Sequence, residues 1–599
     1  MDIPASNKIS VAVLPFKNIS SDQEMNFFCD GMTEEIITAL AKIKQLKVIS
    51  RTSSFAFNDR NVSIKEIAKQ LEVEIVLEGS IRISGNQMRI TIQLVQVEED
   101  SYLWSETWDR KLENLFEIQD EISIAIADKL REHAGHLFIS DHLVENQTNN
   151  LKAYKHYLKG RYHFNKWNPE DINIAIKEFE SAADLDNEMI DAHLGIADSY
   201  SFMAVAGFAP RESAWAKAIQ ALNRAKEIDI NNAGLNYMLA NEAFFTGADY
   251  ATSKKLILKS LENAPTHETS HRFLSYLYVL TGEFKKAKKH LFFAKSVDPL
   301  NPETSFYEAF YYYRTGDYTL ANSITEALLT SNAMNLPALI ISIYIKLKEG
   351  NWQAAQHQIN QSPEEIFTPD ERLGLQCLVE ITKGKTNFDE FVQLIKNAKD
   401  SRAHHAHSYL FICYSLLEKS NEAFEVLQNL FEHKSSILLL SFGNPLCEKI
   451  KGEDSYKKYY QRLYPQTKSF EKSKTSTADK IDEQTSQKDV TKLLSYIQSE
   501  KPYLNPNLSL RMLAGSIGIH PNQLSWLLNQ VIGKNFNEFI NQKRISHFKE
   551  LVVNPENSHI SIIGLAYESG FNSKTVFNTA FKKETGLTPK EYQKLNKNV

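Results

Sequence analysis

Four aromatic residues recur at an interval of 34 along the middle of this 599-residue chain: Tyr250, Phe284, Tyr318 and Trp352. The last three follow a glycine by two places and precede an alanine by three, as Phe284 does with Gly282 and Ala287. Glycine suits a tight turn between two helices, and alanine lets two helices approach closely. A unit of this length cannot bury an apolar face alone, so successive units must stack. The pattern therefore predicts a stack of helical hairpins over residues 151–433.

This pattern resembles the tetratricopeptide repeat, which implies an all-α solenoid with a concave surface. About eight helix pairs are expected, with degenerate copies that begin near Tyr154, Ala192, Leu235, His271, Thr304, Pro337, Arg372 and Ala406. Residues 434–464 are expected to cap the solenoid. The resemblance implies a protein or peptide partner, and the alternative is a spacer or a dimerisation surface.

A second recurring pattern lies near the C-terminus, where an Ala-x-x-x-Gly element appears twice, 52 residues apart. Apolar residues lead to Ala514 and Gly518, and again to Ala566 and Gly570. Each glycine stands where a helix must stop, and a second amphipathic helix follows. Two helices around such a turn are typical of a helix-turn-helix, whose second helix enters the major groove of DNA.

The C-terminal segment resembles the AraC/XylS family of bacterial transcription regulators over roughly residues 488–595. The resemblance rests on Leu513, Ala514, Gly518, Leu524, Gly533, Lys534, Arg544, Ile562, Ala566, Gly570, Phe571, Phe577, Phe581, Lys582, Gly586, Thr588, Pro589 and Tyr592. It implies an all-α DNA-binding domain over 490–595 with two helix-turn-helix motifs, at about 510–531 and 562–584. The recognition helices are expected at 521–531 and 574–584, joined by an amphipathic helix.

The candidate DNA-reading residues lie near the start of each recognition helix. Asn and Gln can read adenine, Lys can read guanine, and Ser or Thr can read either. The base-reading candidates are Asn522, Gln523, Ser525, Trp526, Lys574, Thr575, Asn578 and Thr579. Phosphate or core-edge roles are expected for Lys534, Arg544, Lys582 and Lys583. For each of these positions, a solvated helix face is the alternative interpretation.

The first motif departs from the family pattern in several places. Trp526 stands where the family often has Arg, and His520 replaces the usual Ser at the helix start. Phe548 replaces a usual Ala in the connecting helix. The first recognition helix also contains no Lys or Arg. These differences predict that the first motif reads DNA weakly, or through apolar contacts with thymine methyl groups.

Residues 8–132 are predicted to form a separate α/β unit. Apolar strand patterns alternate with amphipathic helices, and a hairpin is expected with a turn at Gly85 and Asn86. No phosphate-binding glycine motif occurs in this segment. Glu34 and Glu35 lie at an expected helix N-terminus, where acidic residues suit the helix dipole.

The N-terminal unit resembles the TolB-like α/β domain of bacterial regulatory proteins. The resemblance rests on the segments 13–16, 31–36, 50–53 and 77–80, and on Trp104, Glu106, Phe116 and Gln119. It implies no particular reaction, so a structural role and an unidentified ligand pocket both stay open.

The distribution of charge separates the two ends of the chain. Residues 488–599 carry 14 Lys and Arg against 8 Asp and Glu, a net charge of +6, while the whole chain carries −6. The other residues therefore carry −12, and a basic module attached to an acidic body suits DNA binding. Residues 465–489 are polar and charged, which predicts a flexible linker before the module.

Cysteine spacing and hydrophobicity limit the cellular compartment and the kinds of site that the sequence predicts. The four cysteines are widely spaced, which favours free thiols in a reducing compartment and predicts no metal site. The start of the sequence does not resemble a signal peptide, and no apolar stretch is long enough to span a bilayer. We expect a cytoplasmic protein with no membrane partner, no cofactor and no catalytic residues.

Together these patterns predict a multidomain chain: an N-terminal α/β domain, an all-α tetratricopeptide solenoid and a C-terminal all-α double helix-turn-helix module. The expected function is sequence-specific transcription regulation, with the front domains sensing a signal or partner. Double-stranded DNA is the expected ligand, and contact with RNA polymerase and formation of a homodimer are further expectations. The alternative is a protein-interaction scaffold whose DNA affinity is weakened or lost. An enzyme such as a nucleotide cyclase is disfavoured because the remaining residues leave no room for its catalytic segment.

Overall fold

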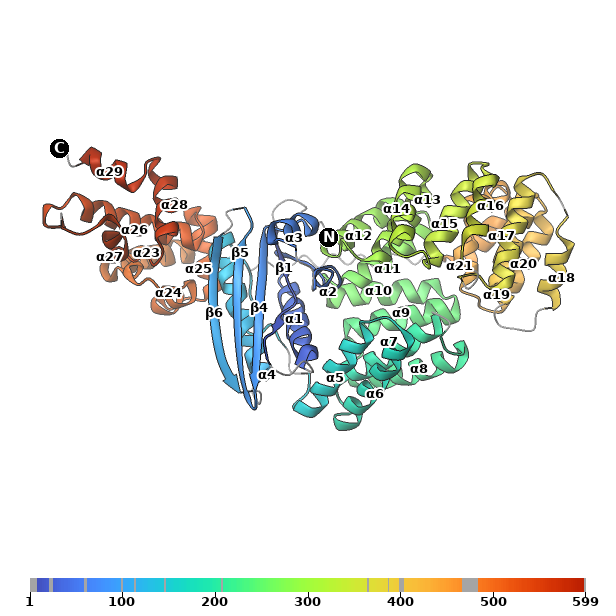
Figure 1. Ribbon diagram of the computed structural model, residues 1–599, viewed down its shortest axis with the longest axis horizontal. Coiled ribbons are helices and arrows are strands. Elements are labelled where there is room, and N and C mark those ends of the chain that lie inside the picture. Colours follow the sequence, from blue (N-terminus) through green and yellow to red (C-terminus); the bar gives the residue numbers. More distant parts are fainter. Residues whose placement is uncertain are drawn as a thin grey trace.

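The computed structural model describes residues 8–596, apart from 21–24, 59–61, 99–100, 112–114, 145–146, 206–207, 364–365, 386, 398–402, 466–482 and 558. Three parts follow one another along the molecule (Figure 1). The solenoid lies at one end and the C-terminal helical module at the other, with a β-sheet between them. This arrangement matches the fold class predicted from the sequence.

The N-terminal part is one mixed sheet with helices on both faces. Its strands are β1 (Ile9–Val13), β2 (Lys17–Asn18), β3 (Leu46–Val48), β4 (Ile75–Ser84), β5 (Gln87–Gln96) and β6 (Ser101–Lys111). Its helices are α1 (Asn26–Ala41), α2 (Arg51–Phe55), α3 (Ile64–Leu71) and α4 (Leu115–Ala134). The strand order is β3-β1-β4-β5-β6; β1 pairs in parallel with β3 and β4, and β4, β5 and β6 are antiparallel.

Two apolar layers hold this part together. α1 and α4 pack on one face of the sheet, where Ile36, Leu40, Ile122 and Ile126 are fully buried. α3 covers the other face. The hairpin turn lies at Gly85 and Asn86 as expected, but the long edge strand β6 was not expected from the sequence. α4 lies against the sheet, and its C-terminal end contacts the C-terminal module.

The solenoid contains eight helix pairs among the described residues between 151 and 432. They are α5 (Leu151–Phe164), α6 (Pro169–Leu185), α7 (Ile190–Val205), α8 (Arg211–Ile228), α9 (Ala233–Gly247), α10 (Tyr250–Asn263), α11 (Glu268–Leu280), α12 (Phe284–Val297), α13 (Pro302–Thr315), α14 (Tyr318–Ser331), α15 (Leu336–Lys348), α16 (Trp352–Gln361), α17 (Pro369–Thr382), α18 (Asp389–Asn397), α19 (Ala403–Leu416) and α20 (Ser420–Glu432). The shorter elements α21 (Ile437–Ser441), η4 (Pro445–Ile450) and α22 (Asp454–Leu463) follow.

The repeated residues do in the structure what their spacing predicts. Gly282, Gly316 and Gly350 stand in the turns with φ of 73°, 87° and 76°, a backbone conformation that other residues resist. The alanines at 287, 321 and 355 are fully buried between helices. These 34-residue units are therefore helical hairpins, each with a glycine in the turn and an alanine packed between the helices.

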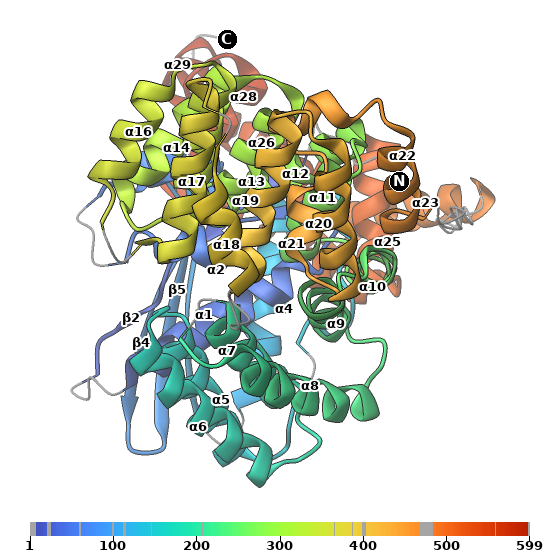
Figure 2. The ribbon, with the colours of Figure 1, turned by 90° about the vertical axis from the view of Figure 1, so that its right-hand side faces the viewer.

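Polar contacts attach the N-terminal domain to the solenoid. Arg161 on α5 pairs with Glu34 on α1, and Arg51 Nε on α2 lies 3.2 Å from a Glu34 oxygen. Ser53 Oγ donates to Asp298 after α12 at 2.7 Å. Early and late helix pairs curve around α1 and α2 when the molecule is seen from the solenoid end (Figure 2). These contacts join the sheet and the solenoid through α1 and α2.

The C-terminal module combines two 18-residue helices, α23 and α26, with several shorter ones. Its elements are α23 (Glu483–Glu500), η5 (Pro502–Leu504), α24 (Leu510–Ile517), α25 (Pro521–Trp526), η6 (Leu527–Ile532), α26 (Phe536–Val553), η7 (Pro555–Asn557), α27 (Ile562–Glu568), α28 (Lys574–Thr585) and α29 (Pro589–Asn596). Most of the predicted linker lies outside the described residues, but residues 483–489 form the start of α23. Residues 483–489, which the sequence assigns to the linker, are therefore helical, because the apolar residues of α23 extend a helix back into the polar segment.

Candidate nucleic-acid interface

The module contains two helix-turn-helix units, each with its own core. The first core includes Leu493, Leu513, Leu524 and Phe539, and the second includes Phe548, Leu565, Phe577 and Phe581. α26 supplies residues to both cores, so it fixes the two units relative to each other. All the buried residues of both cores belong to the module itself. Each core is therefore built from the module's own residues.

Gly570 joins the two units by close approach. Its φ is 91°, and a Cβ atom built on it would lie 2.2 Å from the carbonyl oxygen of Tyr503, in the first unit. Arg544 supports the same junction, because its Nε donates to Tyr503 O at 2.7 Å and its Nη2 donates to Asn505 O at 2.8 Å. Only glycine permits this contact without a shift of the backbone.

The second recognition helix, α28, presents its predicted readers to solvent. Ser573 caps its N-terminus by accepting from Val576 N, and Phe577 and Phe581 are fully buried beneath it. The opposite face carries the four predicted base-reading residues, all exposed: Lys574, Thr575, Asn578 and Thr579. The arrangement leaves a polar helix face that a DNA groove can accept.

The first recognition helix, α25, is covered instead. His520 caps it by accepting from Asn522 N at 3.2 Å, so the histidine fills the role of the usual serine. Asn522 is only 9% exposed and Ser525 is fully buried. Gln523 Nε2 donates to Asp489 on α23 at 2.5 Å, and Trp526 is half-buried. Helix α25 ends at Trp526, and the chain continues as the π-helical turn η6.

The end of α4 and the segment 135–143 cover α25. Arg131 Nη1 donates to Asn522 Oδ1 at 2.7 Å. The backbone of Ile139 forms a pair with the same side chain: its N–H donates to Asn522 Oδ1 at 3.2 Å, and its carbonyl accepts from Asn522 Nδ2 at 3.1 Å. His136 Nδ1 lies 3.3 Å from Ser525 Oγ. Every polar atom of the Asn522 amide group is therefore in use.

Acidic side chains complete the contact around α24. Glu132 Oε1 accepts from the backbone N–H of Leu510, the first residue of α24, at 2.9 Å. Asp128 Oδ2 accepts from Arg511 Nε at 2.9 Å and also pairs with Arg131, whose side chain is 1% exposed. We call α4 residues 128–133 together with segment 135–143 the covering surface.

The four expected phosphate or core-edge residues divide into two pairs. Arg544 is buried, which lowers its pKa to about 10, and backbone carbonyls occupy its guanidinium; this favours the core-edge role. Lys534 Nζ donates to Gln542 Oε1 at 2.5 Å. Lys582 and Lys583 are exposed on α28, and Lys583 lies 2.9 Å from Glu538. Only this second pair stands at the surface of a recognition helix.

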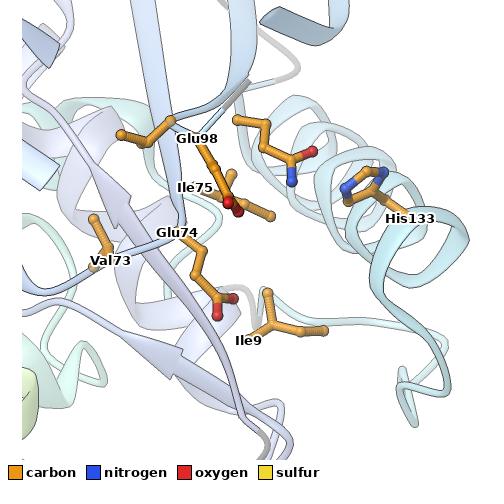
Figure 3. A pocket seen from close by; sticks show the side chains of 8 residues that line it. Ile9, Val73, Glu74, Ile75, Glu98 and His133 are labelled. Carbon is orange, nitrogen blue, oxygen red and sulfur yellow. The ribbon is translucent and has the colours of Figure 1, made fainter. Parts of the chain in front are cut away.

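A cavity of about 440 Å³ lies beside the covering surface (Figure 3). Its lining comes from β1, the adjoining ends of β4 and β5, and the last turn of α4: Ile9, Val73, Glu74, Ile75, Gln96, Val97, Glu98 and His133. Glu74 and Glu98 lie on the sheet side and His133 lies across from them. The carbonyl of His133 accepts from Asn535 Nδ2 in the module at 3.1 Å. One turn of α4 thus touches both the cavity and the DNA-binding module.

Sequence reasoning missed the residues of the covering surface. Asp128, Arg131 and Glu132 belong to an amphipathic helix whose polar face looks like any solvated face, and segment 135–143 carries no motif. Among the described residues, no group of three or more His, Cys, Asp or Glu side chains could hold a metal ion. In the same part of the chain, no helix combines the length and apolar character needed to cross a bilayer.

Comparisons with family models match both ends of the chain. Residues 513–595 match the model described as "Helix-turn-helix domain". Residues 6–125 match "HilA/YgeH-like transcriptional regulator, second domain". The chain therefore carries a helix-turn-helix domain of the kind found in transcription regulators. The TolB-like resemblance of the N-terminal domain stays a prediction.

Curated relatives are similar over limited segments. "Putative adenylate cyclase 3" of Rhizobium meliloti (strain 1021) is 45% identical over 124 residues, 21% of each chain. "Uncharacterized transcriptional regulatory protein YesN" of Bacillus subtilis (strain 168) is 32% identical over 108 residues, 18% of this chain and 28% of that one. "Transcriptional regulator HilA" of Salmonella typhimurium is 22% identical over 237 residues, 38% of this chain and 40% of that one. The chain thus spans from about a fifth to two-fifths of the length of these relatives.

Solved structures resemble the chain only loosely. A tetratricopeptide repeat protein from Parabacteroides merdae ATCC 43184 is 11% identical, covers 48% of this chain and 99% of its own, and has a TM-score of 0.29. Yeast Tom70 is 16% identical, covers 58% and 77%, and has a TM-score of 0.30. At such scores these structures add nothing to the fold described above.

Proposed function

We propose that this protein is a sequence-specific DNA-binding transcription regulator of the cytoplasm, and that its N-terminal domain and solenoid sense a signal or a partner. The observation that carries the proposal is α28, a recognition helix whose four candidate readers are exposed above a buried aromatic core. Its N-terminal Lys574 and its later Lys582 and Lys583 supply positive charge for the DNA backbone. The match of residues 513–595 to a helix-turn-helix domain supports the same reading.

The sensing part of the proposal is supported by the position of α4. This helix packs on the sheet, borders the cavity at His133 and contacts the module through Asp128, Arg131 and Glu132. A ligand changes an equilibrium only if it distinguishes two states. A molecule bound beside the last turn of α4 would do so if it held that turn in a position that cannot contact the module.

The solenoid supplies the second input in this proposal. Its helix pairs form an extended surface of the kind on which protein or peptide partners dock. Contact with RNA polymerase and formation of a homodimer belong to the proposal as well. A competing function is a protein-interaction scaffold with weakened DNA binding, favoured by the covered first recognition helix. The similarity to a protein named as an adenylate cyclase covers 21% of each chain, so we propose no enzymatic activity from it.

The first experiment is selection of duplex DNA from a random pool by residues 483–599, whose two cores are self-contained. We expect a site of about 20 base pairs with two blocks, one for each recognition helix. A salt titration of the selected site should show a steep decrease in affinity from released counterions. Failure to enrich any sequence above non-specific binding would favour the scaffold function.

A further inference from the structure

The first helix-turn-helix is covered by hydrogen-bonding and anionic groups of the kinds that DNA presents to a protein. We propose that the covering surface imitates a DNA site and thereby holds the first helix-turn-helix in a closed state that excludes DNA. This inference rests on the proposed function and adds a mechanism of control to it. Three independent features of the contact support it: a base-like pair at Asn522, phosphate-like carboxylates at α24, and the loss of access to α25.

The base-like feature is the backbone of Ile139. In the major groove an adenine offers one donor, at N6, and one acceptor, at N7, and an asparagine amide can bind both. Ile139 offers Asn522 one donor, its N–H, and one acceptor, its carbonyl, at 3.2 and 3.1 Å. Asn522 therefore makes with Ile139 the pair of hydrogen bonds that it would make with the edge of an adenine.

The phosphate-like feature is a pair of carboxylates at the start of α24. DNA-binding proteins commonly bind phosphate oxygens through backbone N–H groups at helix N-termini and through arginine side chains. Here Glu132 accepts from the backbone N–H of Leu510, and Asp128 accepts from the side chain of Arg511. Both donors are thus satisfied by anionic oxygens of the covering surface.

The closed contact and DNA binding by the first unit exclude each other. Asn522 and Ser525 are buried against Arg131, Ile139 and His136, so no base can reach them. α28 stays exposed. In the closed state the chain would therefore read one block of a two-block site, and reading of both blocks requires α24 and α25 to leave α4.

An exchange of this kind suits a reversible switch. The polar contacts that hold α24 and α25 to the covering surface are hydrogen bonds and ion pairs, and DNA would replace them with bonds of the same type. The free energy between the two states is then a difference of similar terms, which a bound ligand can shift.

The test uses the full chain with substitutions on α4 alone, so that the DNA-binding residues stay intact. Asp128→Asn with Glu132→Gln removes both carboxylate charges and keeps the size of the side chains. Glu121→Gln is the matched control, since this residue of the same helix pairs with Arg110 on β6 instead. We expect the double variant to bind the selected two-block duplex at least about tenfold more tightly than the natural chain, because two charge-assisted bonds are weakened. Equal or weaker binding would overturn the closed state.

A cross-link provides an independent test. All four native cysteines are buried, whereas Asp141 of the covering surface and His520 at the start of α25 are exposed and lie 3.7 Å apart, so a pair introduced by Asp141→Cys and His520→Cys can be joined selectively with a short bifunctional thiol reagent. We expect the joined protein to lose at least about tenfold in affinity for the two-block site relative to the same protein before joining. Unchanged affinity after complete joining would contradict the proposal.

Base preference tests the imitation itself. In the double variant, one position of the first block should prefer adenine, and Asn522→Ala in that background should remove this preference, a change of about 5- to 150-fold in discrimination. A preference for another base that depends on Asn522 would leave the closed state but overturn the imitation.

Binding by the module alone distinguishes failure of the proposed function from failure of the closed state. If residues 483–599 select no DNA sequence, the proposed function fails. If they bind a two-block site and the natural full chain binds it equally tightly, only the closed state fails.

Discussion

The two recognition helices occupy equivalent places in two copies of one motif, yet they meet different surroundings. Asn522 and Ser525 on α25 take the helix positions that Thr575 and Asn578 take on α28. The first pair is buried against the N-terminal domain, and the second pair is exposed. A helix-turn-helix motif thus determines the fold around its recognition helix, while contacts with the rest of the chain determine whether that helix is exposed.

The charge of each helix agrees with its surroundings. α25 and the following turn contain no Lys or Arg, whereas α28 contains Lys574, Lys582 and Lys583. Burial of an unpaired cation against protein is costly, but a neutral polar helix can be buried if its amide and hydroxyl groups are bonded. From the sequence alone, the lack of Lys and Arg predicts weak DNA reading by α25. The same lack allows α25 to be buried against the covering surface, as the proposed closed state requires.

The largest expected effect comes from the junction that makes the two units one body. Gly570→Ala places a Cβ atom 2.2 Å from Tyr503 O at a φ of 91°, so the backbone must shift. We expect the free energy of unfolding of the module to decrease by about 3 kcal/mol, measured by urea denaturation of residues 483–599. Gly515→Ala is the control, because a Cβ there meets nothing within 4 Å on helix α24. Similar stability of the two variants would show that the units are not joined at Gly570.

A smaller loss of stability is expected at Arg544. Arg544→Met removes donors from the carbonyls of Tyr503 and Asn505, which should reduce the free energy of unfolding by about 2 kcal/mol. Lys582→Met is the surface control and should leave stability nearly unchanged while it weakens DNA binding. If Arg544→Met instead reduced the salt dependence of DNA binding and left stability intact, Arg544 would be a phosphate contact after all.

The sequence could predict what lies within each motif but not what lies between domains. The repeat spacing of Phe284, Tyr318 and Trp352 gives the hairpins directly, because each unit contacts its neighbours in the chain. The edge strand β6 has no clear alternation and was not predicted, and the start of α23 was assigned to a linker. The contact of Arg131 with Asn522 joins residues 391 apart, and no local pattern encodes such a distance. The sequence predicts exposed readers on both helices, which agrees with α28 but is wrong for Asn522 and Ser525 on α25.

The unequal surroundings predict unequal effects on DNA binding by the full chain. Asn578→Ala on α28 should weaken binding to the selected duplex by about tenfold, since an exposed reader loses its base contact. Asn522→Ala on α25 should not weaken it, because that side chain is occupied by Arg131 and Ile139. Titration of both variants against the same labelled duplex measures the contrast. In the isolated module, by comparison, both substitutions should weaken binding; a loss for Asn522→Ala in the full chain as well would mean that α25 is open.

The smallest effect expected is a dependence on pH. Burial, together with the nearby Arg131 cation, lowers the pKa of His136, which faces Ser525 of the module in the closed state. Opening would return His136 to an ordinary pKa near 6.5, so the open state binds more protons between the two values. The closed state is therefore fully stabilised above about pH 6.5 and loses stability as the pH falls through that range.

The expected result is a rise of less than about tenfold in the affinity of the full chain between pH 7.5 and 5.5, relative to the isolated module at each pH. His136→Gln should remove this relative rise, because glutamine cannot take up a proton in this range. Persistence of the rise in His136→Gln would assign the pH dependence to other groups of the contact.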